Sequence, residues 1–108
     1  MKFVIYALEN CPYSIKAAEF MSQHPVLKAD VHWVTQDEKE KYKRRNKMST
    51  FPQVFFKYKP SHGKRDRMVM VGGYSELMDI VGVAETLIES KVPLAPLIYL
   101  TRMLQKER

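Results

Sequence analysis

Short apolar runs alternate along the chain with longer segments suited to helices, of which residues 37–46 are highly charged and have few apolar residues. The short runs are rich in β-forming residues and are bounded by polar residues, proline or glycine, which predicts strands. The strands are expected at residues 2–8, 31–34, 53–58 and 68–71, and the helices at residues 12–23, 37–46 and 76–89. This order, β-α-β-α-β-β-α, predicts an α/β fold.

Proline and glycine residues between the elements predict how the elements connect. Pro12 suits the first turn of the first helix, where its missing N–H costs nothing, and Pro25 marks the point before which that helix stops. The run 60–63, Pro-Ser-His-Gly, is a strong turn signal, so the third and fourth strands should form a hairpin. The first two strands flank a helix and should be parallel, with a right-handed crossover. We therefore predict a mixed four-stranded sheet with helices on both faces.

The last residues of the chain are not needed for this fold. We place the domain at residues 1–91 and treat residues 92–108 as a C-terminal extension. Leu97, Leu100 and Leu104 share one face at helical spacing, which predicts a short extra helix. This helix is expected to dock on the domain's own core, and a contact in an oligomer is the alternative.

The positive charge of the chain is uneven. The 108 residues carry a net charge of +6 and suffice for one compact domain. Residues 36–67 hold eleven Lys or Arg against four Asp or Glu. This basic stretch is either a solvated surface or an attraction for acidic partners or nucleic acid. A milder hypothesis is that Lys64, Arg65 and Arg67, near the expected hairpin tip, attract acidic protein partners.

Several classes of protein are not expected from the composition. No apolar run approaches the ~20 residues of a membrane helix, so no membrane partner is expected. The single cysteine forms no internal disulfide, and a reducing, cytoplasmic compartment is the simplest interpretation. His24, His32 and His62 are widely separated and show no metal-ligand spacing, so no metal is expected.

The single cysteine, Cys11, lies where the first strand is expected to meet the first helix. A thiol at a helix N-terminus ionises more readily, and the thiolate is the nucleophile. Ser14 stands where a two-cysteine redox motif carries its second sulfur. Its hydroxyl can donate a hydrogen bond to the thiol but cannot form a disulfide. We predict a reactive thiol that works with an external sulfur, and a buried structural cysteine is the alternative.

Two further motifs offer backbone groups to a ligand. If the Phe51–Pro52 bond is cis, the backbone of Phe51 would turn outward and pair with an extended peptide, although an ordinary strand-initiating proline explains the motif as well. The run 72–76, Gly-Gly-Tyr-Ser-Glu, begins the last helix, with Ser75 as the expected N-cap. Its free N–H groups would suit a carboxylate and Glu76 an ammonium, as at the end of an amino acid or peptide. A plain turn and cap is the alternative.

The three motifs together resemble the glutaredoxin family in order and spacing. They are Cys-Pro-Tyr at 11–13, Thr-Phe-Pro at 50–52 and Gly-Gly-Tyr-Ser at 72–75, and the resemblance covers about residues 2–90. It implies the thioredoxin-like fold and glutathione as co-substrate. Ser14 departs from the usual Cys-Pro-Tyr-Cys and is either natural or an engineered Cys→Ser change.

The resemblance also implies a glutathione site. The cysteinyl sulfur of glutathione would lie near Cys11, its backbone on Phe51 and its γ-glutamyl end on Ser75 and Glu76. Either Arg45 or Lys47 would hold the glycine carboxylate, and spacing does not choose between them. The implied glutathione-binding residues are Tyr13, Arg45, Lys47, Thr50, Phe51, Pro52, Gly73, Ser75 and Glu76, beside the catalytic residues Cys11 and Ser14.

The function implied is a glutathione-dependent thiol–disulfide oxidoreductase that reduces protein–glutathione mixed disulfides by a monothiol mechanism through Cys11. Its expected partners are glutathione and glutathionylated or disulfide-containing proteins, with ribonucleotide reductase as one candidate. A monomer without a nucleic-acid partner is expected. One alternative is a module that holds a 2Fe–2S cluster with glutathione between two protomers. The other is nucleic-acid binding through residues 36–67.

Overall fold

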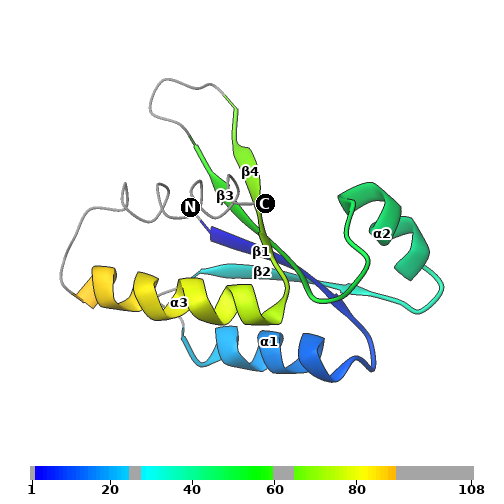
Figure 1. Ribbon diagram of the computed structural model, residues 1–108, viewed down its shortest axis with the longest axis horizontal. Coiled ribbons are helices and arrows are strands. Elements are labelled where there is room, and N and C mark those ends of the chain that lie inside the picture. The colour runs from blue at the N-terminus through cyan, green and yellow to red at the C-terminus, as the bar shows by residue number, and fades with distance from the viewer. Residues whose placement is uncertain (1, 25–27, 60–64, 90–108) are drawn as a thin grey trace.

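The computed structural model describes residues 2–24, 28–59 and 65–89 (Figure 1), with only the backbone described for residues 83–89. The elements are β1 Lys2–Leu8, α1 Pro12–Ser22, β2 Ala29–Val34, α2 Lys39–Asn46, β3 Gln53–Tyr58, β4 Arg67–Gly72 and α3 Tyr74–Glu89. The predicted order of strands and helices is confirmed. The extra helix expected within 92–108 lies outside the described residues, as do residues 60–64 of the basic turn.

The four strands form one mixed sheet in the order β2-β1-β3-β4. β1 lies parallel to β2, with Ile5 opposite Val31, and antiparallel to β3, with Ile5 opposite Val54. β3 and β4 form the expected antiparallel hairpin. This arrangement confirms the thioredoxin-like α/β fold. It also places the C-terminal end of β1 beside the N-terminal end of β3, where the site is built.

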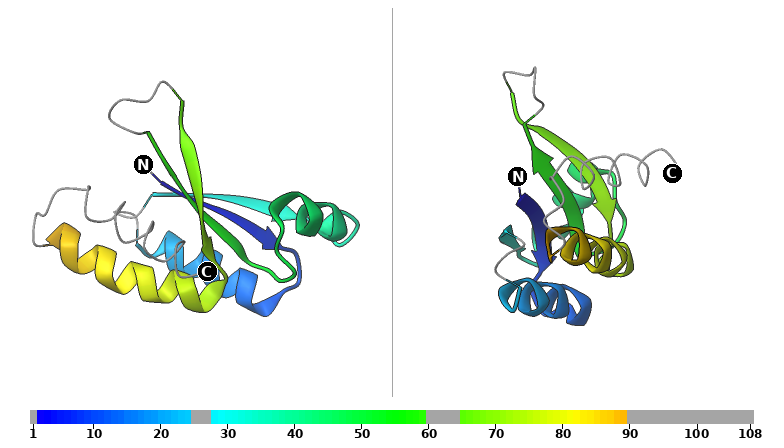
Figure 2. Two further views of the ribbon diagram at one scale, coloured as in Figure 1. Left: turned by 45° about the horizontal axis from the view of Figure 1, so that its top comes forward. Right: turned by 90° about the vertical axis from the view of Figure 1, so that its left-hand side faces the viewer.

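The main core lies between the sheet and two helices, α1 and α3, which lie side by side on one face (Figure 2). Alternate residues of β1 point into it, because successive side chains of a strand face opposite sides of the sheet. Core residues from the strands include Phe3, Ile5, Ala7, Val54, Phe56, Val69 and Val71, and those from the helices include Ala17, Met21, Leu77, Ile80 and Val81. Phe3 and Phe56 meet edge to face, with ring centroids 5.2 Å apart.

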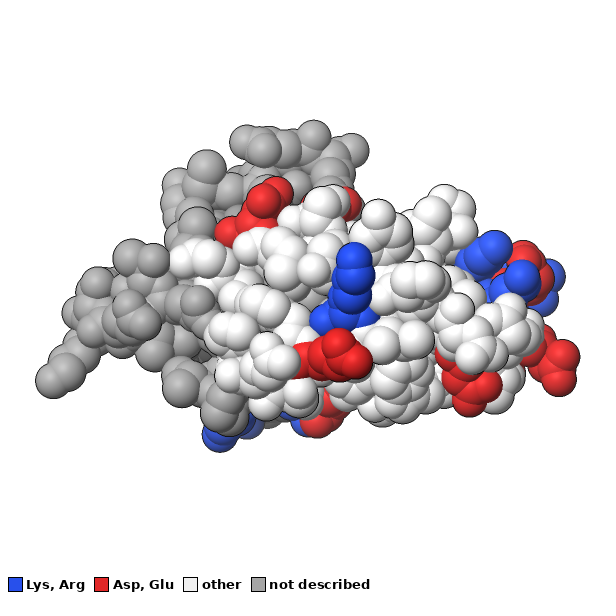
Figure 3. Space-filling view, turned by 90° about the horizontal axis from the view of Figure 1, so that it is seen from below, with Lys and Arg blue, Asp and Glu red and all other residues white. Residues whose placement is uncertain are grey.

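The helix α2 packs on the opposite face of the sheet. The Tyr6 ring lies 5.3 Å from the ring of Tyr42, and Asn46 Nδ2 donates to Gln53 Oε1 at 2.8 Å. Tyr6 and Gln53 alternate with the core-facing residues of their strands, so helices cover both faces as predicted. No residue of α2 is buried, which fits its charged sequence. The face that carries α1 and α3 shows few charges, whereas charged side chains gather at one end of the molecule (Figure 3).

The start of α3 differs from the prediction. The helix begins at Tyr74, so Ser75 is its second residue and the predicted Ser75 N-cap is wrong. The Gly73 carbonyl instead accepts the Leu77 N–H at 3.0 Å, the first turn of the helix. Gly72 has φ 134°, a conformation that favours glycine, and it turns the chain from β4 toward this helix. The turn therefore depends on backbone freedom at Gly72 and needs no side-chain cap.

Two other boundaries differ by two residues. β2 begins at Ala29, because its ladder with β1 continues back to the bond from Phe3 N–H to the Lys28 carbonyl at 2.8 Å. α2 begins at Lys39, because Glu38 folds back and accepts the Thr35 hydroxyl at 3.0 Å in the preceding turn. Within the described part of the chain, no helix has the length and apolarity needed to cross a membrane.

Candidate functional site

Cys11 is the N-cap residue of α1, as the sequence predicts. Its backbone is extended (φ −95°, ψ 117°), Pro12 begins the helix, and the Cys11 carbonyl accepts the Ile15 N–H at 3.0 Å. The first N–H groups of a helix have no intrahelical partner, and the positive end of the helix dipole lies there. Cys11 is free and only half-buried. A fully buried structural cysteine, the alternative reading, is therefore wrong.

Ser14 faces the interior and does not bond to the thiol. Its side chain is fully buried, and its Oγ accepts the backbone N–H of Leu8 at 3.0 Å. The hydrogen bond to sulfur that the sequence suggested is absent from the described structure. The reason is the shape of the junction: the turn through Asn10 (φ 64°) brings the end of β1 back over the first turn of α1. Ser14 thus ties the strand to the helix that presents Cys11.

The second motif reaches Cys11 from forty residues away. The Cys11 thiol donates to the Phe51 carbonyl oxygen, with Sγ and O 3.9 Å apart. The Phe51–Pro52 peptide bond is cis, as the sequence analysis considered, and both residues are buried. The backbone of Phe51 therefore faces the thiol at the edge of the site.

A pocket of about 680 Å³ brings the three motifs together. Tyr13 comes from α1, Thr50 and Phe51 from the loop before β3, and Gly73, Ser75 and Glu76 from the start of α3. Its remaining lining residues are Lys47, Met48, Ser49, Met70 and Tyr74. Pro52 lies behind the pocket: a Cβ added to Gly73 would lie 3.8 Å from the Pro52 carbonyl oxygen.

The first turn of α3 gives this pocket hydrogen-bond donors. Leu77 is bonded to the Gly73 carbonyl, whereas the N–H groups of the residues before it precede the intrahelical ladder. The Ser75 hydroxyl donates to a carboxylate oxygen of Glu76. The N-terminal turn of α3 and a carboxylate therefore stand beside each other. Such a pair suits a ligand end that carries both a carboxylate and an ammonium.

The two basic candidates are separated by the end of α2. Lys47 ends the helix in a left-handed conformation (φ 54°) and lines the pocket. Arg45 lies over the ring of Tyr42, with its Cζ 5.8 Å from the ring centroid, and does not line the pocket. The structure thus brings Lys47 toward the other predicted residues and leaves Arg45 exposed beside Tyr42, outside the pocket lining.

The sequence did not single out several residues that shape the site. Tyr74 packs against Tyr13, with ring centroids 5.5 Å apart, and the two rings form one wall of the pocket. The signal for Tyr74 was its place inside the Gly-Gly-Tyr-Ser motif. Met48, Ser49 and Met70 carried no signal, because only the packing of the loop against β4 brings them in.

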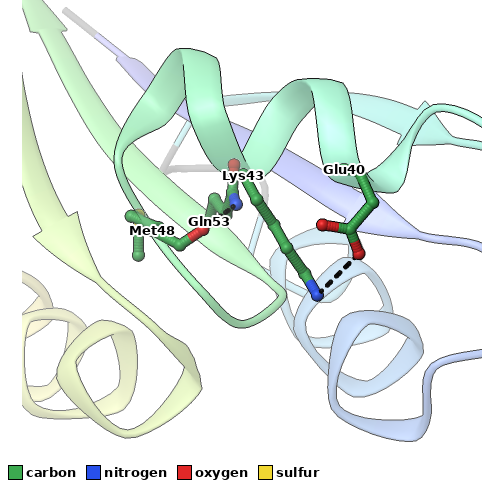
Figure 4. A network of polar contacts seen from close by, with 4 residues as sticks. All are labelled: Glu40, Lys43, Met48 and Gln53. Carbon is green, nitrogen blue, oxygen red and sulfur yellow. Dashed lines mark hydrogen bonds and ion pairs between the residues drawn. The ribbon is translucent and has the colours of Figure 1, made fainter.

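Gln53 is a second residue that the sequence did not predict. It is fully buried, and its Nε2 donates to the Met48 carbonyl at 3.3 Å, while its Oε1 accepts from Asn46. Figure 4 shows Gln53 beside Met48, under the end of α2, with the Lys43–Glu40 ion pair further along the same helix. Gln53 therefore holds the loop that lines the pocket against β3.

Comparison with known proteins identifies the family. The Glutaredoxin family model matches residues 3–60, more than half of the chain, including Cys11 and Thr50–Pro52. The chain belongs to the glutaredoxin family. Glutaredoxin membership supports a thiol–disulfide oxidoreductase role. No group of three His, Cys, Asp or Glu in the described ranges is arranged to hold a metal ion.

The similar curated proteins are glutaredoxins of Rickettsia. Glutaredoxin 1 of Rickettsia felis is 34% identical over 80 residues, covering 71% of this chain and 69% of that protein. Glutaredoxin 1 of Rickettsia conorii is 35% identical with the same coverage. Glutaredoxin 1 of Rickettsia prowazekii is 42% identical over 55 residues, and this chain spans 58% of its length.

Proposed function

We propose that this glutaredoxin is a glutathione-dependent oxidoreductase that reduces protein–glutathione mixed disulfides through Cys11 alone. The observation that carries the proposal is the position of the Cys11 thiol. It stands at the N-cap of α1, 3.9 Å from the Phe51 carbonyl, next to a pocket with donors at its far side. A tripeptide with a central thiol and charged ends matches this arrangement.

The proposed binding mode assigns each end of glutathione to a part of the pocket. The γ-glutamyl carboxylate would accept from the N–H groups of Ser75 and Glu76, and the Glu76 carboxylate would take the ammonium. The glycine carboxylate would pair with Lys47. Tyr13 would cover one side of the ligand, and the backbone of Phe51 would pair with the cysteinyl unit.

The proposed reaction has two exchange steps. The Cys11 thiolate attacks the glutathione sulfur of a mixed disulfide, a bond forms between these two sulfurs, and the protein leaves as a thiolate that takes a proton from water. The thiolate of a second glutathione then attacks the glutathione sulfur bound to Cys11. This step releases oxidised glutathione and restores the Cys11 thiolate. With one cysteine in the chain, no internal disulfide competes with the second step.

Mass spectrometry of the protein after incubation with oxidised glutathione tests the site and the ligand together. We expect one glutathione adduct, mapped to Cys11, that forms faster than the adduct from bis(2-hydroxyethyl) disulfide, which lacks charged ends. Equal rates with the two disulfides would contradict glutathione recognition. A brown dimer after anaerobic purification would instead favour the cluster-binding module.

Replacing Lys47 by glutamine is expected to raise KM for a glutathionylated peptide about two- to fivefold, with kcat little changed. The estimate follows from the loss of one exposed ion pair, worth up to about 1 kcal/mol. Arg45→Gln is the matched control, because it removes the same charge two residues away without touching the pocket. If Arg45→Gln raises KM and Lys47→Gln does not, the assignment of the glycine carboxylate to Lys47 is wrong.

A further inference from the structure

A second pocket lies at the other end of the sheet from Cys11. Its volume is about 490 Å³, and its lining residues are Lys2, Lys28, Lys57, Tyr58, Lys59 and Asp66. Lys2 begins β1, whereas Cys11 follows the end of the same strand, so the length of β1, about 20 Å, separates the two places. We call this second pocket the lysine pocket.

Two of its lysines lie directly opposite each other on adjacent strands. Lys2 of β1 and Lys57 of β3 are partners in the antiparallel register. Directly opposed residues on one face have their Cβ atoms about 5 Å apart, and like charges in such a pair destabilise a sheet. The other features of this sheet agree with its fold. A single pair that costs stability in such a sheet is typical of a functional site.

Carboxylates compensate this pair only in part. The Lys2 ammonium lies 2.5 Å from Asp30 of β2, and the Lys57 ammonium lies 3.6 Å from Asp66. These contacts are one-third to one-half exposed and therefore weak. Lys28 and Lys59 are exposed and form no ion pair with any residue of the described ranges. Among the described lining residues, four lysines thus face the pocket with one carboxylate, Asp66, while Asp30 contacts Lys2 from β2.

The lowered pKa of Asp30 is consistent with positive charge around this pocket. The hydrogen bond from Lys2 lowers the pKa of Asp30 most, loss of solvent contact opposes this and raises the pKa, and the nearby Lys2, His32 and Lys57 lower it further. The pull on Asp30 therefore extends beyond its own partner to the lysine of β3. An anion placed between Lys2 and Lys57 would meet this field from both strands.

We propose that the lysine pocket binds a compact anion with two or more phosphate groups, such as inorganic triphosphate or the phosphate chain of a nucleotide. Its volume lies in the range of small-molecule sites. Lysine binds phosphate as a point charge, whereas paired recognition of a carboxylate favours arginine. The Tyr58 ring is 4% exposed and stacks on Phe56, so it offers no open surface to a base. Recognition therefore rests on the phosphates.

The distribution of charge favours a compact ligand over a nucleic-acid strand. The basic residues of α2 lie where β3 begins, beside Gln53, and those of the lysine pocket lie where it ends. The six residues of β3 hold the two groups about 20 Å apart. The basic residues described within 36–59 and 65–67 therefore do not form one continuous track along which a phosphate backbone would run.

Titration of the full ¹⁵N-labelled chain with sodium triphosphate, followed by NMR, tests the proposal. We expect saturable shifts of the amides of Lys2, Lys28, Lys57 and Lys59, with the Cys11 amide unmoved. The Lys2→Gln/Lys57→Gln variant should bind triphosphate roughly tenfold more weakly, because two charged contacts are lost. The matched control is Lys41→Gln/Arg44→Gln on α2, which removes the same charge and should leave the affinity within about twofold.

Removing a carboxylate near the pocket, rather than a lysine, distinguishes binding in this pocket from binding driven by the overall positive charge. Asp30→Asn and Asp66→Asn each remove a carboxylate that competes for a pocket lysine, so each should tighten triphosphate binding more than the distant Glu40→Gln, which removes the same charge on α2.

The proposal is overturned if the amide shifts do not saturate, or if the Lys2→Gln/Lys57→Gln variant and the Lys41→Gln/Arg44→Gln control weaken triphosphate binding equally. It is also overturned if a 20-nucleotide thymidine strand binds more tightly than triphosphate, with shifts that extend over α2. Turnover of a small glutathione disulfide should be unchanged in every variant.

Discussion

Replacing Cys11 by serine is expected to reduce turnover of a glutathionylated peptide to the uncatalysed background. The hydroxyl of serine remains protonated near neutral pH and forms no disulfide, so neither exchange step of the proposed reaction can begin. The fold should be almost unaffected, because Cys11 is half-buried and its side chain makes one long contact to the Phe51 carbonyl. We expect the free energy of unfolding to change by about 0.5 kcal/mol or less.

Two measurements on the Cys11→Ser variant separate a loss of catalysis from a loss of folding. The rate is followed with a glutathionylated peptide and excess glutathione, and stability is followed by urea unfolding. A folded Cys11→Ser protein that keeps measurable turnover would defeat the proposed function, because no other cysteine exists in the chain. The lysine pocket would be untouched by that outcome, since its test reads anion binding at the other end of β1.

Replacing Ser14 by alanine is expected to destabilise the protein by about 1–3 kcal/mol while leaving the glutathione reaction in place. The Ser14 hydroxyl is fully buried and accepts the Leu8 N–H, so its removal leaves a backbone donor without its partner. Urea unfolding measures the loss. Ser22→Ala is the matched control in the same helix, because the Ser22 hydroxyl bonds to the Glu19 carbonyl at the exposed end of α1. It should cost about 0.5 kcal/mol or less.

The activity of the Ser14→Ala variant separates a structural role from a catalytic one. Its hydroxyl points to the end of β1 and away from chemistry at the thiol, so turnover below the unfolding transition should stay within a few-fold of the parent. A Ser14→Ala protein that is as stable as the parent would contradict the role of the Leu8 contact. A stable variant as inactive as Cys11→Ser would instead make Ser14 part of the reaction.

The local pattern of the chain predicted the elements and the position of the thiol. Apolar runs predicted all four strands, and Pro12 after Cys11 predicted the start of α1, because Pro at the first helical position and a preceding extended residue are local preferences. The three short motifs then indicated the family, which the comparisons confirm. Errors appeared at boundaries such as the start of α3, where the backbone of Gly72 and Gly73 made the turn and the side chain of Ser75 was not needed.

The partners of individual side chains were decided by the tertiary structure. The sequence by itself determined that a single thiol stands at a strand–helix junction in a β-α-β-α-β-β-α chain, because such preferences act over a few residues. It could not show that Ser14 bonds to Leu8, that Lys47 and not Arg45 lines the pocket, or that Lys2 faces Lys57. The Lys2–Lys57 contact arises when β1 pairs with β3, which brings together residues about fifty positions apart, and the Ser14 contact arises where α1 folds back over the end of β1. Hydrophobic burial of the sheet sets that pairing, and the polar and charged side chains at its two ends follow from it.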